Sequence, residues 1–227
     1  MKFDLILFDA DGTLLEFEEA ETKSFFQACN KLKIKCDLEQ LRTKYQVVNS
    51  AIWKEFEDEK ITAEKLREER FRRLFNQEQL SISPAEMSKE YLDYLSQKTN
   101  LLKNALAIVK YCSQKSKIAL ITNGLTDVQK LRIGQSPLKK YFKDIFISEE
   151  IGYPKPNPKI FYYVFKRIKV NPENTIIIGD NLNSDIKGGK EFGMKTCWFN
   201  PKNKKNVTAI QPDFEINELM ELKKIIS

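Results

Sequence analysis

The stretch "FDLILFDADGT", residues 3–13, joins an apolar run to two aspartates. The run from Leu5 to Phe8 is typical of a strand that is covered on both faces of a parallel sheet. Asp9 and Asp11 follow it two positions apart, so in extended backbone their carboxylates share a face, about 6–7 Å apart. We therefore expect a buried strand whose carboxyl end carries a pair of acids.

Similar apolar runs recur along the chain, and helical patterns separate most of them. We expect five strands in all, at residues 3–8, 117–122, 144–148, 175–179 and 195–200. The helical pattern at residues 158–170 places its apolar side chains on one stripe. This alternation predicts an α/β fold with a doubly wound parallel sheet.

The interval between the first two strands breaks this rhythm. Residues 16–96 contain no convincing strand and show several charged amphipathic helical patterns. A crossover between parallel strands needs only about a dozen residues. We therefore expect a catalytic core formed by residues 1–15 and 97–227, with residues 16–96 as an inserted all-helical domain.

Composition bounds the class of protein. The chain has 227 residues, 41% hydrophobic and 31% charged, which is the balance of a soluble globular protein. No apolar run approaches the roughly 20 residues of a membrane span, and the N-terminus does not resemble a secretory signal. We expect a cytoplasmic protein without a membrane partner.

The net charge is +6, and basic residues are spread along the chain. The densest basic group, residues 201–206, is more typical of a solvated loop than of a nucleic-acid patch. We therefore expect no nucleic-acid polymer as a partner, and a monomer or homodimer. A mild positive field would still attract an anionic small substrate.

The chain has no histidine. This absence excludes Ser-His-Asp triads, histidine phosphotransfer and histidine-ligated zinc. The four cysteines, Cys29, Cys36, Cys112 and Cys197, lack CxxC spacing and are expected to be reduced thiols, with a Cys29–Cys36 disulfide as the open alternative. Chemistry must therefore use carboxylates, lysine, hydroxyls and backbone groups.

Polar residues gather at the predicted strand ends, where open α/β sheets bind ligands. Beyond Asp9 and Asp11, these residues are Thr122, Asn123, Gly124, Lys155, Asp180 and Asp185. Each has a structural alternative, since a lone aspartate is often a turn or helix-capping residue and a lone lysine is usually solvated. Those alternatives would have to hold independently at several strand ends, so the combination predicts one reactive site.

Charge counting favours a metal at this site. Four ionised carboxylates and one lysine sum to −3, and crowding them without compensation would cost several kcal/mol. Mg²⁺ prefers oxygen ligands, retained waters and a substrate phosphate. We expect Mg²⁺ as the cofactor and a small-molecule phosphate ester as the partner.

Four motifs resemble those of the haloacid dehalogenase-like (HAD) hydrolases in order and spacing. They are "DADGT" at 9–13, "TNG" at 122–124, "KPNP" at 155–158 and "GDNLNSD" at 179–185. The helical insertion resembles the C1 cap of that superfamily. Three longer stretches, 48–62, 147–161 and 179–201, resemble bacterial noncanonical pyrimidine 5′-nucleotidases.

The resemblance implies a mechanism. Asp9 would attack phosphorus and form an aspartyl-phosphate, while Asp11 would protonate the leaving group and then deprotonate water. Mg²⁺ would be held by the carboxylates of Asp9 and Asp180 and by the backbone carbonyl of Asp11, with Asp185 acting directly or through water.

The remaining motif residues would handle the phosphate. The resemblance implies that Lys155 neutralises phosphate charge and orients Asp9. Thr122 and the backbone at Asn123 and Gly124 would bind phosphoryl oxygens, and Thr13 would fix Asp11.

Several alternatives stay open beside a 5′-nucleotidase. Asp11 argues against a dehalogenase, because a halide leaves without a proton. A phosphatase or phosphomutase acting on a sugar phosphate or other metabolite remains possible. Phosphonate hydrolysis through a lysine of the insertion is disfavoured, as is a non-catalytic binding protein, since every motif residue is present. A receiver-like signalling module is disfavoured by the motif order.

The insertion is expected to select the substrate. Trp53 could stack on a pyrimidine base and Asn49 could hydrogen-bond its edge. The alternative, which helical spacing favours, makes Trp53 and Phe56 part of the insertion's own core.

Overall fold

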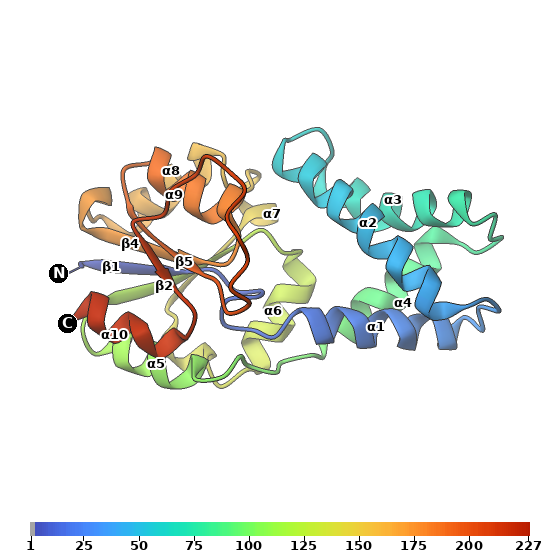
Figure 1. Ribbon diagram of the computed structural model, residues 1–227, viewed down its shortest axis with the longest axis horizontal. Coiled ribbons are helices and arrows are strands. Elements are labelled where there is room, and N and C mark those ends of the chain that lie inside the picture. The colour runs from blue at the N-terminus through green and yellow to red at the C-terminus, as the bar shows by residue number, and fades with distance from the viewer. Residues whose placement is uncertain (1–2) are drawn as a thin grey trace. The chain divides into compact units, whose positions relative to one another are not determined.

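The computed structural model describes residues 3–227, within which six strands form one sheet. The strands are β1 (Leu5–Phe8), β2 (Lys117–Thr122), β3 (Asp144–Ile147), β4 (Thr175–Gly179), β5 (Lys195–Phe199) and β6 (Phe214–Ile216). Their order is β3-β2-β1-β4-β5-β6 and every pairing is parallel. Figure 1 labels β1, β2, β4 and β5 of this sheet. The predicted doubly wound α/β fold is confirmed.

β6 is absent from the sequence-based expectation. It has three residues, and only Ile216 is buried. So short and half-exposed a strand produces no apolar run, and its pairing with β5 is needed to define it.

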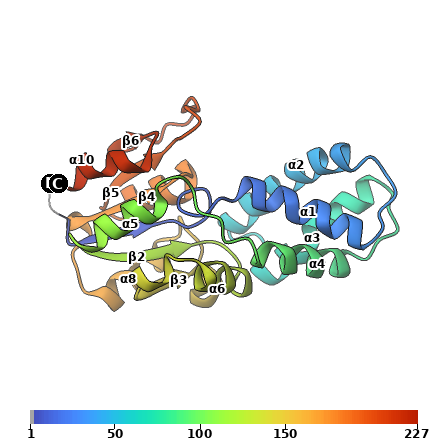
Figure 2. The same cartoon turned by 90° about the horizontal axis from the view of Figure 1, so that it is seen from below.

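The helices of the core cover both faces of the sheet. They are α5 (Ala105–Ser113), α6 (Thr126–Gln135), α7 (Ser148–Ile151), α8 (Pro158–Ile168), α9 (Lys187–Glu191) and α10 (Leu222–Ile226). Single helical turns occur at Lys139–Tyr141, Pro172–Asn174, Leu182–Ile186 and Leu219–Glu221. In Figure 1, α8 and α9 lie on one side of the sheet and α5 and α10 on the other; Figure 2 views the chain from the α5 and α10 side.

The central strand β1 explains why its sequence is apolar throughout. Ile6 and Phe8 belong to the apolar cluster that includes α5 and α10, whereas Leu5 and Leu7 belong to the cluster that includes α8. Successive side chains of a strand point to opposite faces. Both faces are covered, so every position must be apolar, and β1 becomes a rigid base for the residues that follow it.

The order of strands places a topological switch at β1 and β4. The chain runs outward from β1 through β2 to β3, and then returns to the other side of β1 as β4. Ligands of open α/β sheets bind beyond the carboxyl ends of the strands at such a point. Asp9 follows β1 and Asp180 follows β4, so both lie at the switch.

Contacts divide the chain into two compact units, residues 1–16 with 99–227 and residues 17–98. The sequence-based prediction set the insertion at 16–96. The second unit consists of α1 (Glu18–Lys31), α2 (Leu38–Glu57), α3 (Ala63–Gln77) and α4 (Pro84–Ser96).

Side-chain caps begin three helices of the second unit. Asp37 accepts hydrogen bonds from the backbone of Glu39 and Gln40, and Thr62 and Ser83 cap α3 and α4 in the same way. The interior of this unit is aromatic: the rings of Tyr45 and Phe71 stack with centroids 5.4 Å apart.

The cysteines form no disulfide: Cys29, Cys112 and Cys197 are buried thiols and Cys36 is an exposed one. Among residues 3–227, every helix is too short or too polar to span a bilayer.

Candidate active site

The loop after β1 lies directly against the loop after β4. The Asp9 amide donates to the Ile178 carbonyl at 2.9 Å, which extends the β1–β4 pairing to the first aspartate. Gly12 has φ +81°, and a Cβ there would lie 2.6 Å from Asp180 Oδ2. Only glycine fits both the left-handed backbone and this close approach, so "DADGT" can reach the carboxylate that follows β4.

Three carboxylates meet at this junction. Asp9, Asp180 and Asp185 each offer one oxygen, and these oxygens all lie within 4.8 Å of one another. Asp185 is 1% exposed and accepts a hydrogen bond from the Asn181 amide at 3.1 Å. A Cβ at Gly179 would lie 2.2 Å from the Asp185 carboxylate, so the glycine that ends β4 makes room for this buried acid.

Lys155 enters the same cluster from the segment between α7 and α8. Its Nζ donates to Asp9 Oδ1 at 2.7 Å, to Asp185 Oδ1 at 2.6 Å and to the Ile121 carbonyl at 2.9 Å. The side chain is 1% exposed, so the alternative of a solvated lysine is wrong. Burial alone would lower the Lys155 pKa, but Asp185 and Asp9 outweigh it and raise the pKa above its ordinary value.

Asn123 fixes the backbone that carries Lys155. Its Nδ2 donates to the Lys155 carbonyl at 2.8 Å, and its Oδ1 accepts from the Lys155 amide at 2.7 Å. This reciprocal pair ties the "TNG" segment after β2 to the "KPNP" segment. From the sequence only the Asn123 backbone was predicted to act at the site, and this role of its side chain was not predicted.

The cluster carries an excess of negative charge. Three carboxylates against one ammonium group sum to −2 when all are ionised. Burial and the neighbouring Asp9 and Asp185 raise the pKa of Asp180 well above its ordinary value, which shows how costly that charge is without a cation. Burial raises the pKa of Asp185 to about 6, and Lys155 acts in the opposite direction. A hard divalent cation with oxygen ligands fits this donor set and its charge. The predicted ligands Asp9, Asp180 and Asp185 lie together, whereas the Asp11 side chain is not in this group.

Thr122 and Thr13 place two hydroxyls at the site. Thr122 is 1% exposed, and its Oγ1 accepts hydrogen bonds from the Gly124 amide and from Gln129 Nε2, both at 3.1 Å. Thr13 Oγ1 donates to Asp9 Oδ2 at 3.2 Å. The prediction that Thr13 fixes Asp11 was wrong, because this hydroxyl orients the first aspartate of the motif.

The Asp11 carboxylate is turned toward α6. Gln129 Nε2 donates to Asp11 Oδ2 at 2.5 Å, and Arg132 Nη1 contacts Asp11 Oδ1. Burial raises the pKa of Asp11, although the Arg132 guanidinium acts in the opposite direction. Gln129 and Arg132 were not predicted from the sequence. Their spacing of three along a predicted helix was the available signal, but it does not distinguish a buried polar pair from a solvated one.

Asn49 and Trp53 lie on α2 in the second unit. Asn49 is buried, and its Nδ2 donates to Glu21 Oε1 at 2.8 Å. The Trp53 ring packs edge-on against Phe56, with ring centroids 5.8 Å apart. The substrate contacts assigned to Asn49 and Trp53 stay predictions.

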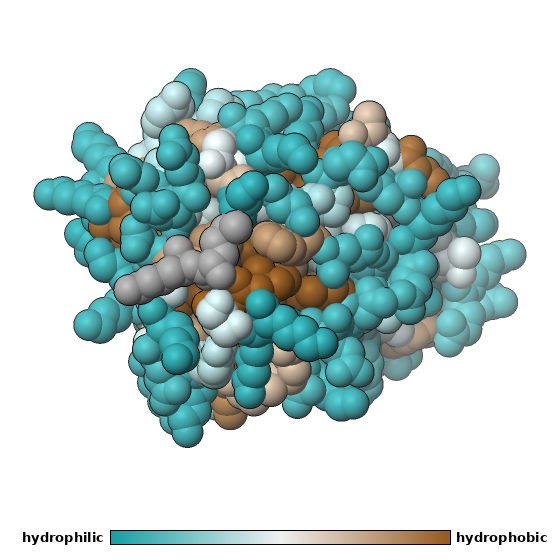
Figure 3. Space-filling view, turned by 60° about the vertical axis from the view of Figure 1, so that its left-hand side comes forward, coloured by the Kyte–Doolittle hydropathy of each residue, from teal (hydrophilic) through white to brown (hydrophobic). Residues whose placement is uncertain are grey.

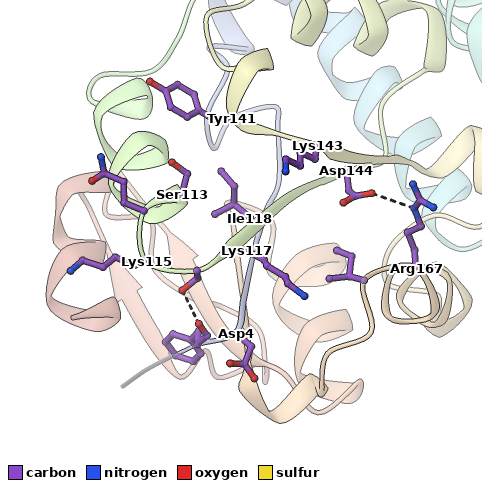
Figure 4. A pocket seen from close by; sticks show the side chains of 13 residues that line it. Asp4, Ser113, Lys115, Lys117, Ile118, Tyr141, Lys143, Asp144 and Arg167 are labelled. Atoms are coloured by element: carbon purple, nitrogen blue, oxygen red, sulfur yellow. Dashed lines mark hydrogen bonds and ion pairs between the residues drawn. The ribbon is translucent and has the colours of Figure 1, made fainter.

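A separate depression lies at the opposite end of the sheet. It has a volume of about 760 Å³ and is lined by residues at the starts of β1, β2 and β3, among them Asp4, Lys117 and Asp144. Figure 4 shows Arg167 facing Asp144 there. Arg167 Nε donates to Asp144 Oδ1 at 3.4 Å. Figure 3 views the core from this end, where hydrophilic residues surround a central hydrophobic area. The acidic cluster is at the other ends of these strands.

The strand order, the buried lysine and the acidic cluster define the class of protein. The chain matches the haloacid dehalogenase-like hydrolase family over residues 3–193, and it belongs to that family.

Individual relatives match nearly the whole chain. YfnB of Bacillus subtilis is 34% identical over 100% of this chain and 96% of its own length. The magnesium-bound crystal structure of YfnB has a TM-score of 0.92 to this chain and covers 100% of both. The pyrimidine 5′-nucleotidase PynA of Streptococcus pneumoniae is 32% identical over 98% of this chain and 94% of its own length. The pyrimidine 5′-nucleotidase YjjG of Escherichia coli is 30% identical over 100% of this chain and 99% of its own.

Proposed function

We propose that this protein is a Mg²⁺-dependent phosphomonoester hydrolase that acts on pyrimidine nucleoside 5′-monophosphates. One observation carries the proposal: the Asp9 carboxylate is held by Lys155 and Thr13 beside two further carboxylates. A carboxylate fixed in this way is oriented for in-line attack on phosphorus. The nucleotide part rests on the similarity to PynA and YjjG.

Asp9, Asp180 and Asp185 are the residues that would hold the cation, because their oxygens converge and their charge exceeds that of Lys155. A backbone ligand from Asp11 belongs to the same proposal. When bound, Mg²⁺ supplies positive charge that stabilises the phosphoryl oxygens in the transition state.

Residues of the chain perform two successive phosphoryl transfers, first from the ester to Asp9 and then from Asp9 to water. An Asp9 oxygen attacks phosphorus, the ester P–O bond breaks, and Asp11 gives its proton to the leaving alkoxide oxygen. Asp11 then takes a proton from water as the water oxygen attacks phosphorus. The bond between Asp9 and phosphorus breaks, and inorganic phosphate leaves.

The groups that would bind the phosphate are a positive charge and hydrogen-bond donors. Lys155 offers its ammonium charge, and Thr122 with the backbone at Asn123 and Gly124 offers hydrogen bonds to phosphoryl oxygens. The Gly124 amide donates to Thr122 Oγ1 at 3.1 Å, and Lys155 Nζ donates to the carbonyl of the preceding residue, Ile121, at 2.9 Å. This closeness supports the proposal that these groups bind one phosphate.

A substrate panel tests the proposal. Uridine, deoxyuridine and thymidine 5′-monophosphates are compared with sugar phosphates, with Mg²⁺ and with EDTA. We expect the nucleotides to be preferred and EDTA to abolish turnover. A preference for sugar phosphates would reject the nucleotide part, and transfer of phosphate to a second sugar would favour a phosphomutase.

A matched pair of variants tests the nucleophile. Asp9→Asn removes the attacking carboxylate, and we expect turnover to fall below detection. Asp4→Asn lies before β1 on the surface and serves as the control with wild-type activity. Full activity of Asp9→Asn would reject the covalent mechanism.

A further inference from the structure

Two buried polar residues of α6 face the motif acid Asp11. Gln129 and Arg132 are both 0% exposed, and their spacing of three places them on one face of the helix. Arg132 Nη1 contacts Asp11 Oδ1, and Gln129 Nε2 donates to Asp11 Oδ2 at 2.5 Å. Each oxygen of this carboxylate therefore has its own donor, which restricts rotation of the side chain.

Both donors are themselves held in place. Arg132 Nη2 donates to the Glu16 carbonyl at 2.9 Å, which fixes the plane of the guanidinium. Gln129 Nε2 lies 3.1 Å from Thr122 Oγ1 and so bridges Thr122 and Asp11. A Cβ at Gly124 would lie 2.1 Å from Gln129 Nε2, so the glycine of "TNG" leaves space for the glutamine.

Stability alone gives a weak reason for this arrangement. A buried ion pair contributes little over apolar residues of similar volume, because both charges lose their hydration. The pair here joins a helix to the one motif acid that lies outside the carboxylate group of Asp9, Asp180 and Asp185. Its position matches a need for fixed geometry at Asp11.

We infer that Gln129 and Arg132 are positioning residues that hold the Asp11 carboxylate at a fixed place beside Asp9, and that Gln129 aligns Thr122 with it. The inference rests on the proposed function, in which Asp11 protonates the leaving group. A general acid contributes only when it lies within hydrogen-bond reach of the leaving oxygen. Loss of either donor releases Asp11 from that place.

The choice of substrate separates positioning from general stability. In a nucleoside 5′-monophosphate the nucleoside leaves through its 5′ oxygen as an alkoxide, which needs a proton, whereas 4-nitrophenolate leaves without one. The ratio kcat/KM covers only the steps up to the first irreversible transfer, so it excludes the later hydrolysis of the aspartyl-phosphate. A positioning defect therefore lowers kcat/KM for uridine 5′-monophosphate more than for 4-nitrophenyl phosphate.

The experiment compares four variants of the full chain with the wild type in Mg²⁺. Arg132→Met and Gln129→Met remove the donors, Arg132→Lys keeps the charge, and Lys130→Met is the control on the exposed side of α6. Lys130 is 61% exposed and pairs with Glu150. We expect both donor removals to lower kcat/KM for the nucleotide about tenfold or more relative to the aryl ester, which is part of the roughly 100- to 10,000-fold that general-acid catalysis contributes. Arg132→Lys recovers part of the loss, and Lys130→Met has wild-type values.

Equal losses on both esters, or no loss on either, would overturn the inference. Thermal unfolding of each variant identifies any that does not fold. If Arg132→Met does not fold, Gln129→Met and Arg132→Lys give the same substrate comparison. A wild-type protein inactive on both esters would overturn the proposed function and the inference together, whereas an active wild type with unselective variants overturns the inference alone.

Discussion

Lys155 Nζ lies 2.7 Å from Asp9 Oδ1, although 146 positions separate the two residues in the chain. The lysine side chain is 1% exposed and the aspartate side chain 10% exposed. This ion pair joins the segment before α8 to the end of β1, and it orients the residue to which we assign the attack on phosphorus.

Replacing Lys155 by methionine removes the cation between Asp9 and Asp185. We expect the free energy of unfolding to fall by about 3 kcal/mol without Mg²⁺, because breaking a buried pair leaves charges uncompensated. Urea unfolding measures this loss. Mg²⁺ should restore more stability to the variant than to the wild type, since the variant has the larger negative charge. Lys159→Met, in the nearby helix α8, is the control, and a similar loss there would contradict the explanation.

Gly12→Ala introduces a Cβ 2.6 Å from Asp180 Oδ2 at a φ of +81°. Gly152 offers a matched control, because its φ is +88° and a Cβ there meets nothing within 4 Å. Both alanines carry the cost of a left-handed backbone, about 1–2 kcal/mol. Only Gly12→Ala should also displace Asp180 and raise the Mg²⁺ concentration needed for half-maximal turnover. A similar Mg²⁺ requirement in both variants would show that the close approach has no effect on the cation.

The raised pKa of the Glu21 carboxyl group predicts that the stability of the helical unit depends on pH. Burial raises the pKa of Glu21 above its ordinary value of 4.5, and Arg70 acts in the opposite direction. The folded state therefore binds this proton more tightly than the unfolded chain does. The stability that Glu21 contributes is full below about pH 4.5 and falls as the pH rises toward the raised pKa.

The comparison of wild type with Glu21→Gln isolates this effect. The stability of the wild type relative to the variant should fall as the pH rises from 4.5. The chain has two tryptophans, so a Trp198→Phe background leaves Trp53 as the fluorescence probe of the helical unit. A constant difference between the two proteins from pH 4.5 to neutral pH would contradict the prediction.

Asn49 and Trp53 are the proposed contacts to the pyrimidine. We expect Trp53→Leu to raise KM for uridine 5′-monophosphate severalfold, because stacking on a base contributes about 1–3 kcal/mol. Asn49→Ala should also raise this KM, because it removes the proposed hydrogen bond to the edge of the base. KM for 4-nitrophenyl phosphate should change little. Equal changes for both substrates would favour the alternative, in which Trp53 and Asn49 support the packing of α2.

Much of the site was predictable because it follows strand ends. Asp9, Thr122 and Asp180 come directly at or after apolar runs, and parallel strands bring their carboxyl ends to one edge. The contacts of Thr13 were not predictable, since its hydroxyl could reach either motif aspartate. The short strand β6 was not predictable either, because its assignment depends on its pairing with β5 and not on a local apolar pattern.

The sequence by itself determined the doubly wound sheet, the helical insertion and the set of acids at the strand ends, because hydrophobic period and chain order are local properties. Only the tertiary structure decided that Lys155 is buried between Asp9 and Asp185, and that Gln129 and Arg132 hold Asp11. The physical reason is that the energy of a charged side chain depends on the partners and the solvent around it. Those partners come from segments far away in the chain, which only the folded arrangement brings into contact.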